Sequence, residues 1–318
     1  MLESTRKRFC FTGIVMILLL SLGLTACGNS SDDEDSGSAK NDNDNGDSGV
    51  ALGDKDITLP YVAWAGVEAR TQLLAQVLED VGYNVETKVV EAGPMFSSVA
   101  DGSADFTPVL WLPTTHGEYW DKYEDDLTKV NEVLDQAPLS LTVPSYMDVD
   151  SIEDLKDNKE LGEATDWKLT GIDPGAGIMN SAEKAMDEYG LDNWELQQSS
   201  EAAMLSTLGK AYDNEEPIII TGWKPHWMFA EWDLKMLDDP EEIFGGDGDQ
   251  IYIVARNDFE DDSPAAYRIL EQYTEDYDQL NELMGEIHGG KDPEEVAKQF
   301  IENNQDKVDE WVEGVEKE

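Results

Sequence analysis

The chain has 318 residues, with 70 Asp or Glu against 22 Lys or Arg, so its net charge is −48 at pH 7. Phosphate binding needs clustered Lys and Arg, so this balance argues strongly against nucleic acid as a partner. Two interpretations of the acid stay open. The surface is adapted to high external salt, which screens self-repulsion, or the charge only keeps the protein in solution.

The first 26 residues have the pattern of an export signal. Arg6, Lys7 and Arg8 precede a short apolar stretch at residues 14–24. That order predicts a cleaved signal peptide rather than a membrane span. The ending Leu-Thr-Ala-Cys resembles the lipobox of bacterial lipoproteins, which implies a lipid on Cys27 and a place on the outer face of the cell membrane. The alternative is an ordinary signal peptide followed by a chance cysteine.

Residues 27–55 follow as a tether rich in Gly, Ser, Asn and Asp, with almost no apolar side chain. Such a segment cannot bury enough apolar surface to offset its chain entropy, so we expect it to be disordered. The sequence has two cysteines, Cys10 and Cys27. The first leaves with the signal peptide and the second carries the lipid, so we expect no disulfide in the mature protein.

From Asp56 on, strands and helices alternate in two similar copies. The first copy predicts a strand at 57–64, a helix with apolar residues at helical spacing up to 81, a strand at 85–90, a helix at 95–100 and a strand at 106–112. The second predicts a strand at 168–173, a helix at 179–189, a strand at 194–197, a helix at 202–212 and a strand at 218–223. A strand at 251–255 and helices near 264–285, 292–303 and 305–316 complete the chain.

Alternating strands and helices favour an α/β fold with mostly parallel sheets. Two copies predict two lobes joined by two chain crossings. Residues 56–143 plus 251–318 form lobe I, and residues 146–248 form lobe II. Ligands of open α/β sheets bind beyond the carboxyl ends of the strands, so we expect a ligand cleft between the lobes.

Three tryptophans, Trp64, Trp111 and Trp223, end predicted strands at that edge. A lone Trp is usually core packing, but three at equivalent strand ends point to a ligand box. Indole faces attract cations, and a quaternary ammonium has no N–H to donate, so cation–π contact of about 0.5–2 kcal/mol per ring suits it. Sugar stacking is the alternative, although the cluster of polar side chains that sugars need is not evident.

Two further elements could hold an anion. A glycine-rich turn at 171–179 leads into a helix, where backbone amides such as those of Gly177 and Ile178 could bind a carboxylate. It lacks the spacing of a dinucleotide fingerprint. His116, five residues after Trp111, could donate a hydrogen bond to the same carboxylate or be a surface histidine. His226 lies similarly in the second copy and ranks lower as a direct contact.

At these residues the chain resembles the glycine betaine substrate-binding lipoproteins of bacterial ABC importers. The segments that carry the resemblance are Tyr-Val-Ala-Trp at 61–64, Val-Glu-Ala-Gly-Pro-Met at 90–95, Trp-Leu-Pro-Thr-Thr-His at 111–116, the glycine-rich turn, and residues 218–229. The resemblance implies a type II periplasmic-binding-protein-like fold. It implies that Trp64, Trp111 and Trp223 surround the trimethylammonium, and that Gly177, Ile178 and His116 hold the carboxylate.

The leading hypothesis is a monomeric solute-binding protein that captures glycine betaine or proline betaine between its lobes. It delivers the ligand to the permease subunit of an ABC importer for osmoprotection. Choline or carnitine binding, or ligand sensing without transport, are the alternatives. An enzyme is not expected, because no nucleophile motif, paired-carboxylate signature or metal-ligand spacing stands out, and we expect no cofactor and no metal.

Overall fold

The computed structural model describes residues 49–317. The predictions of a signal peptide, of a lipid on Cys27 and of a tether up to residue 48 lie outside the described residues. Within 49–317 no helix combines the length and the apolar character needed to cross a membrane.

The first group of strands comes from both ends of the described chain. β1 (Asp56–Tyr61) and β2 (Asn84–Val89) pair in parallel. β10 (Asp249–Arg256) runs antiparallel between β3 (Phe106–Leu112) and β4 (Leu127–Ala137). We call these strands and the helices that pack on them lobe I.

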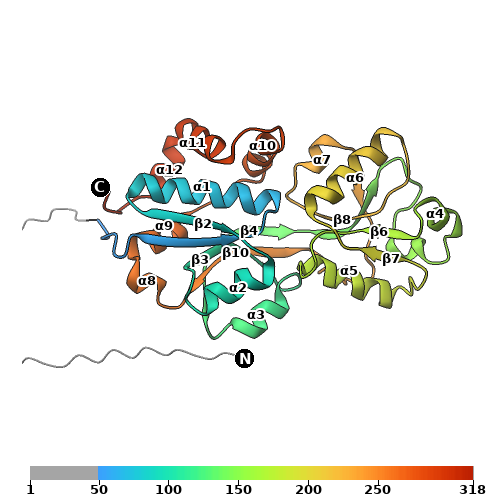
Figure 1. Ribbon diagram of the computed structural model, residues 1–318, viewed down its shortest axis with the longest axis horizontal. Helices are drawn as coiled ribbons and strands as arrows, with labels where there is room; N and C mark the ends of the chain where they lie inside the picture. The colour runs from blue at the N-terminus through green and yellow to red at the C-terminus, as the bar shows by residue number, and fades with distance from the viewer. Residues whose placement is uncertain (1–48, 318) are drawn as a thin grey trace, which may run out of the picture. The chain divides into compact units, whose positions relative to one another are not determined.

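Helices cover both faces of the lobe I strands, as Figure 1 shows with α1, α10 and α11 on one side of β1 and β2 and α2, α3 and α8 on the other. Helix α1 (Ala65–Val81) buries the apolar residues at helical spacing that predicted it, and it ends at Gly82, whose φ is 123°. Glycine suits such a left-handed helix end. The buried residues at helical spacing are Val67, Leu74, Val77, Leu78 and Val81. The other helices are α2 (Ala92–Ala100), α3 (Gly117–Tyr123), α8 (Phe259–Asp262), α9 (Pro264–Gln272), α10 (Tyr277–His288), α11 (Pro293–Asn303) and α12 (Gln305–Trp311).

The second group is one five-stranded sheet in the order β7-β6-β8-β5-β9. We call it, with its helices, lobe II. Its strands are β5 (Leu139–Pro144), β6 (Lys168–Thr170), β7 (Glu195–Gln197), β8 (Ile220–Trp223) and β9 (Leu234–Met236). Its helices are the 3-10 helix η1 (Ile152–Leu155), α4 (Lys159–Ala164), α5 (Gly177–Glu188), α6 (Glu201–Asp213) and α7 (Met228–Glu231).

The two-lobed α/β class is as predicted, but the sheets are mixed rather than mostly parallel. Within the two copies, the pairs β1–β2, β6–β7 and β6–β8 are parallel, whereas β3 of the first copy pairs antiparallel with β10. The strands that carry the chain between the lobes or back again, β4, β5, β9 and β10, form the antiparallel pairs. These connecting strands were not predicted, apart from β10.

The first chain crossing differs from the predicted one. β4 and β5 are almost continuous and are separated only by Pro138, which has no N–H to donate to a ladder. β5 pairs with β8 and β9, so residues 139–143, predicted in lobe I, lie in the lobe II sheet. The region near 264–285 is two helices, because the Asp276 side chain accepts from the backbone N–H groups of Asp278 and Gln279 and starts α10 anew.

The last residues of the predicted tether lie against lobe I. Val50 pairs with Val315, Leu52 is buried, and the Tyr83 hydroxyl donates to the Leu52 carbonyl at 2.6 Å. The Asp54 N–H donates to the Asp262 carbonyl at 2.7 Å. Residues 49–55 are therefore ordered by backbone hydrogen bonds, contrary to the predicted disorder. Their few apolar residues include Val50 and Leu52, which pack on lobe I.

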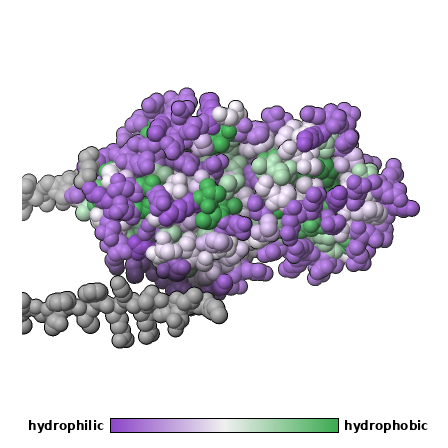
Figure 2. All heavy atoms as spheres, in the orientation of Figure 1, coloured by the Kyte–Doolittle hydropathy of each residue, from purple (hydrophilic) through white to green (hydrophobic). Residues whose placement is uncertain are grey.

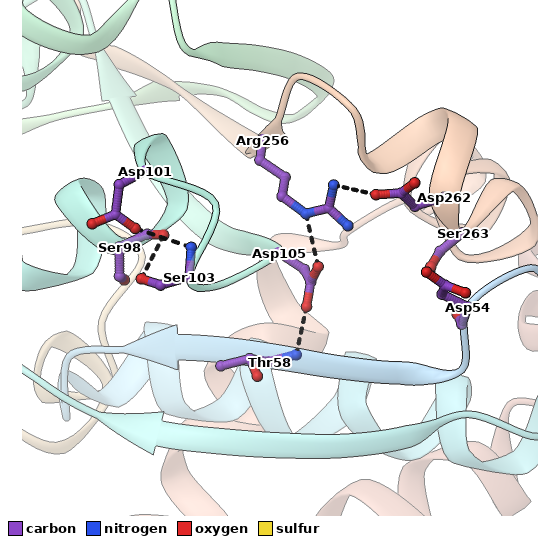
Figure 3. A network of polar contacts seen from close by, with 9 residues as sticks. All are labelled: Asp54, Thr58, Ser98, Asp101, Ser103, Asp105, Arg256, Asp262 and Ser263. Carbon is purple, nitrogen blue, oxygen red and sulfur yellow. Dashed lines mark hydrogen bonds and ion pairs between the residues drawn. The ribbon is translucent and has the colours of Figure 1, made fainter. Parts of the chain in front are cut away.

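A polar network closes the amino-terminal edge of β1 and β3, where the chain enters these strands (Figure 3). Asp105 accepts from the Thr58 N–H at 2.7 Å and pairs with Arg256 at 2.9 Å, and Arg256 also pairs with Asp262 at 2.6 Å. Trp64, which follows β1, and Trp111, near the end of β3, lie at the opposite ends of these strands. The surface shown in Figure 2 is mostly hydrophilic, in keeping with the large excess of acidic residues.

Candidate functional site

One cavity brings together all six residues that the sequence predicted for the ligand. Its empty space, including the solvent in its open mouth, is about 530 Å³. Both lobes contribute to its walls, so it lies in the cleft between them. The lining residues are Trp64, Gly66, Val67, Arg70, Trp111, Thr115, His116, Leu139, Ile172, Ala176, Gly177, Ile178, Trp223, Pro225 and Leu280.

The three tryptophans reach the cavity from three chain segments. Trp111 belongs to β3 and Trp223 ends β8, as predicted. Trp64 stands three residues beyond the end of β1, at the position that precedes α1. Each is 8% exposed, so each ring presents only a small area to the cavity. A cation held among three such rings would be largely removed from water. Cation–π attraction is strongest in such a desolvated place.

His116 precedes α3 and is buried beside the tryptophan rings. Its ring lies nearly parallel to that of Trp64, with an interplanar angle of 8° and centroids 6.4 Å apart. The Trp111 N–H donates to Nδ1 at 2.9 Å, so Nδ1 is the acceptor and the proton of the neutral ring is on Nε2. Burial lowers the pKa of His116 from 6.5 to about 3, which keeps the ring neutral.

The Nε2–H of His116 is a buried donor with no acceptor among the described residues. Leaving such a donor unpaired costs about 1–3 kcal/mol. Because His116 lines the cavity, an oxygen of a bound molecule could accept a hydrogen bond from this N–H.

The glycine-rich turn leads into a second group of N–H donors at the cavity. Gly175 has a φ of +88°, and α5 then starts with Gly177 and Ile178, whose residues both line the cavity. The first N–H groups of a helix have no partner within it, and the helix dipole favours a negative charge there. The helix start and His116 therefore offer N–H donors to the same cavity.

Direct contacts between the lobes surround the cavity. The Trp64 indole N–H donates to the Asp173 carboxylate at 3.1 Å, and the Tyr119 hydroxyl donates to the Gly175 carbonyl at 2.9 Å. A Cβ at Gly177 would lie 1.7 Å from the Thr115 carbonyl oxygen, so only glycine permits this approach. The lobes are thus closed on each other in this structure.

Sequence patterns did not single out several buried charged residues near the site. The carboxylate of Asp249 accepts from the N–H groups of Thr114 and Thr115, both at 2.8 Å, and so fixes the turn before His116. Arg70 lines the cavity and forms a two-fold ion pair with Glu275, in which both side chains are almost fully buried. These carboxylates are not distinguishable from 68 other acidic residues without the fold.

His226 is buried but is not among the cavity-lining residues. Its Nδ1 accepts from the Met228 N–H at 3.0 Å, and its Nε2 faces the Glu201 carboxylate at 3.1 Å. Its lower rank as a direct ligand contact agrees with this position.

A family model described as the substrate binding domain of ABC-type glycine betaine transport system matches residues 55–303. The chain belongs to this family. Its members are solute-binding components of ABC importers, so the family function is binding rather than catalysis. The match covers all of lobe II, lobe I up to residue 303, and every cavity-lining residue.

Individual relatives agree with the family. The chain is 48% identical over 161 residues to the glycine betaine/carnitine transport binding protein GbuC of Listeria monocytogenes. That match covers 50% of this chain and about half, 53%, of the Listeria protein. The lactococcal OpuAC structure, closed and complexed with glycine betaine, is 36% identical, with a TM-score of 0.77 over 82% of this chain and all of that chain.

A further solved structure is the glycine/betaine/L-proline-binding protein ProX of Borrelia burgdorferi. It is 33% identical and has a TM-score of 0.78, and the match covers 81% of this chain and 97% of that one. These neighbours confirm the two-lobed type II binding-protein fold, and they are homologues that bind glycine betaine or related solutes by name.

Proposed function

We propose that this chain captures glycine betaine, or a related quaternary-ammonium zwitterion such as proline betaine, in the cleft between its lobes. The trimethylammonium group would lie among Trp64, Trp111 and Trp223. The carboxylate would accept hydrogen bonds from His116 Nε2 and from the backbone N–H groups of Gly177 and Ile178.

The observation that carries the proposal is the unpaired Nε2–H of His116 in a cavity walled by three indoles. The rings favour a cation that has no N–H, and the buried donor requires an acceptor. One small molecule that joins a quaternary ammonium to a carboxylate satisfies both demands. Choline offers the cation without the carboxylate, so it would leave the helix start of α5 and His116 without an anion.

We further propose that the protein is a monomer, that it is extracytoplasmic and held at the outer face of the cell membrane by a lipid on Cys27, and that it delivers its ligand to a membrane permease. For the lobes, we propose that lobe I comprises residues 56–137 and 249–317 and lobe II comprises residues 139–236. The strand pairings of β5 and β10 support these limits. Hinge movement at the two crossings would open the cleft.

Calorimetric titration tests the ligand assignment. Glycine betaine, proline betaine, carnitine and choline should be titrated separately into the purified protein, with glycine betaine and proline betaine binding tightly. Choline should bind at least tenfold more weakly than glycine betaine, because it cannot accept from His116. Choline binding as tight as that of glycine betaine would show that the carboxylate contacts do not operate.

A further inference from the structure

Glu201 is a buried carboxylate that links the two lobes beside the cavity. It is the first residue of α6 in lobe II and is 4% exposed. Its Oε1 and Oε2 accept from the backbone N–H of Ala65 in lobe I at 3.1 and 3.3 Å. Its Oε1 also lies 3.1 Å from Nε2 of His226 in lobe II.

The two partners of Glu201 belong to segments that carry ligand-box tryptophans. Ala65 directly follows Trp64, and His226 is three residues after Trp223, with which its ring makes an edge contact at 5.1 Å. One carboxylate therefore connects the Trp64 segment of lobe I with the Trp223 segment of lobe II.

The Glu201 carboxylate caps the helix of the opposite lobe, α1, rather than its own helix, α6. α6 already has a side-chain cap, because Ser200 accepts from the Ala203 N–H at 3.2 Å. α1 has no such cap from the residue that precedes it, Trp64. The N-terminus of the 17-residue helix α1, which carries a positive partial charge, is thus stabilised by a carboxylate of the opposite lobe.

We infer that Glu201 is a positioning residue for ligand capture, because its bond to Ala65 joins the Trp64 and Trp223 walls in the closed cleft. This inference rests on the proposed function. When the lobes separate, water replaces Glu201 at the start of α1, so the bond stabilises the closed state alone. A hydrogen bond from a backbone N–H to a charged carboxylate stabilises the closed state. Because the ligand binds the closed state, this bond raises the affinity for the ligand.

The structure offers a variant for each end of this bond. Glu201→Ala removes the acceptor. Ala65→Pro removes the donor and leaves Glu201 and His226 in place. Proline is well tolerated at the first position of a helix, and Trp64, with φ −95° and ψ 140°, has the extended backbone that a following proline needs. Glu183→Ala, an exposed site on α5, is the matched control.

Calorimetry with glycine betaine should show about tenfold to a hundredfold weaker binding for Glu201→Ala and about tenfold weaker binding for Ala65→Pro. Glu183→Ala should stay within about twofold of the original protein. The double variant should bind about as weakly as the weaker single variant, because both changes break one bond. Glu201→Gln, which keeps an oxygen for Ala65, should recover part of the loss.

Unchanged affinity in either single variant, or losses that multiply in the double variant, would overturn the inference. If the original protein does not bind glycine betaine at all, the proposed function fails separately. Amide hydrogen exchange of the Ala65 N–H then decides about Glu201. Slower exchange in the original protein than in Glu201→Ala supports the bond, and equal exchange overturns it.

Discussion

The neutral, buried imidazole of His116 makes protein stability depend on pH in a specific window. In an unfolded chain the histidine has a pKa near 6.5, whereas burial lowers the pKa to about 3 in the folded protein. Between these values the unfolded state binds more protons than the folded state. Stability from this group is therefore complete above pH 6.5 and is lost as the pH falls toward 3.

The size of the loss follows from the two pKa values. Between pH 8 and pH 5 the unfolded state gains about 2 kcal/mol from protonating His116, while the folded state gains almost nothing. Replacing the ring removes this contribution. The variant His116→Gln, whose amide oxygen can still accept from the Trp111 N–H, should therefore lose about 2 kcal/mol less than the original protein over the same interval.

Urea unfolding followed by tryptophan fluorescence, at pH 8 and pH 5 without ligand, measures the difference. All other ionisable groups are the same in the two proteins, so comparison of the two pH dependences isolates His116. Equal losses of unfolding free energy in the two proteins would show that burial does not lower the pKa of His116. They would mean that the imidazole of His116 takes up a proton in the folded state as readily as in the unfolded chain.

Three other outcomes are expected. Trp111→Ala should weaken glycine betaine binding more than tenfold in calorimetry, and Trp111→Phe should weaken it less, because an aromatic face remains; equal affinity for Trp111→Ala would remove that wall from the box. Gly177→Ala should weaken binding at least tenfold, since its Cβ would meet the Thr115 carbonyl, whereas Gly285→Ala, with open space around it, should not; similar effects of both would contradict the close approach of the lobes. Raising NaCl from about 0.1 to 1 M should raise the melting temperature by screening the net charge of −48, and a fall would show that repulsion is not limiting.

Periodic apolar residues allowed much of the fold to be predicted. Helix α1 and strand β3 are where the apolar pattern placed them, because each buries a regular face or a whole strand. β4 was missed for a physical reason. Its burial alternates imperfectly, with bulges against β10, so its sequence lacks a clean two-residue period. β5 is buried at all six positions, so its sequence also lacks a two-residue period, and it begins directly after Pro138.

The candidate site was predictable where unusual residue types carry it. Tryptophan at three strand ends and a glycine-rich turn are rare enough to be noticed. Glu201 and Asp249 are not, because a chain with 70 acidic residues hides two whose carboxylates are buried. Their role depends on which backbone N–H groups lie opposite in the fold, and sequence separations of 136 and 135 residues give no local signal.

Binding of both ends of a betaine in one cavity can be tested on a single side chain. The most direct measurement is calorimetric titration of glycine betaine into the original protein and into His116→Ala. We expect saturable binding to one site in the original protein and about tenfold to a hundredfold weaker binding in the variant. No binding to the original protein, or equal binding to both, would contradict it.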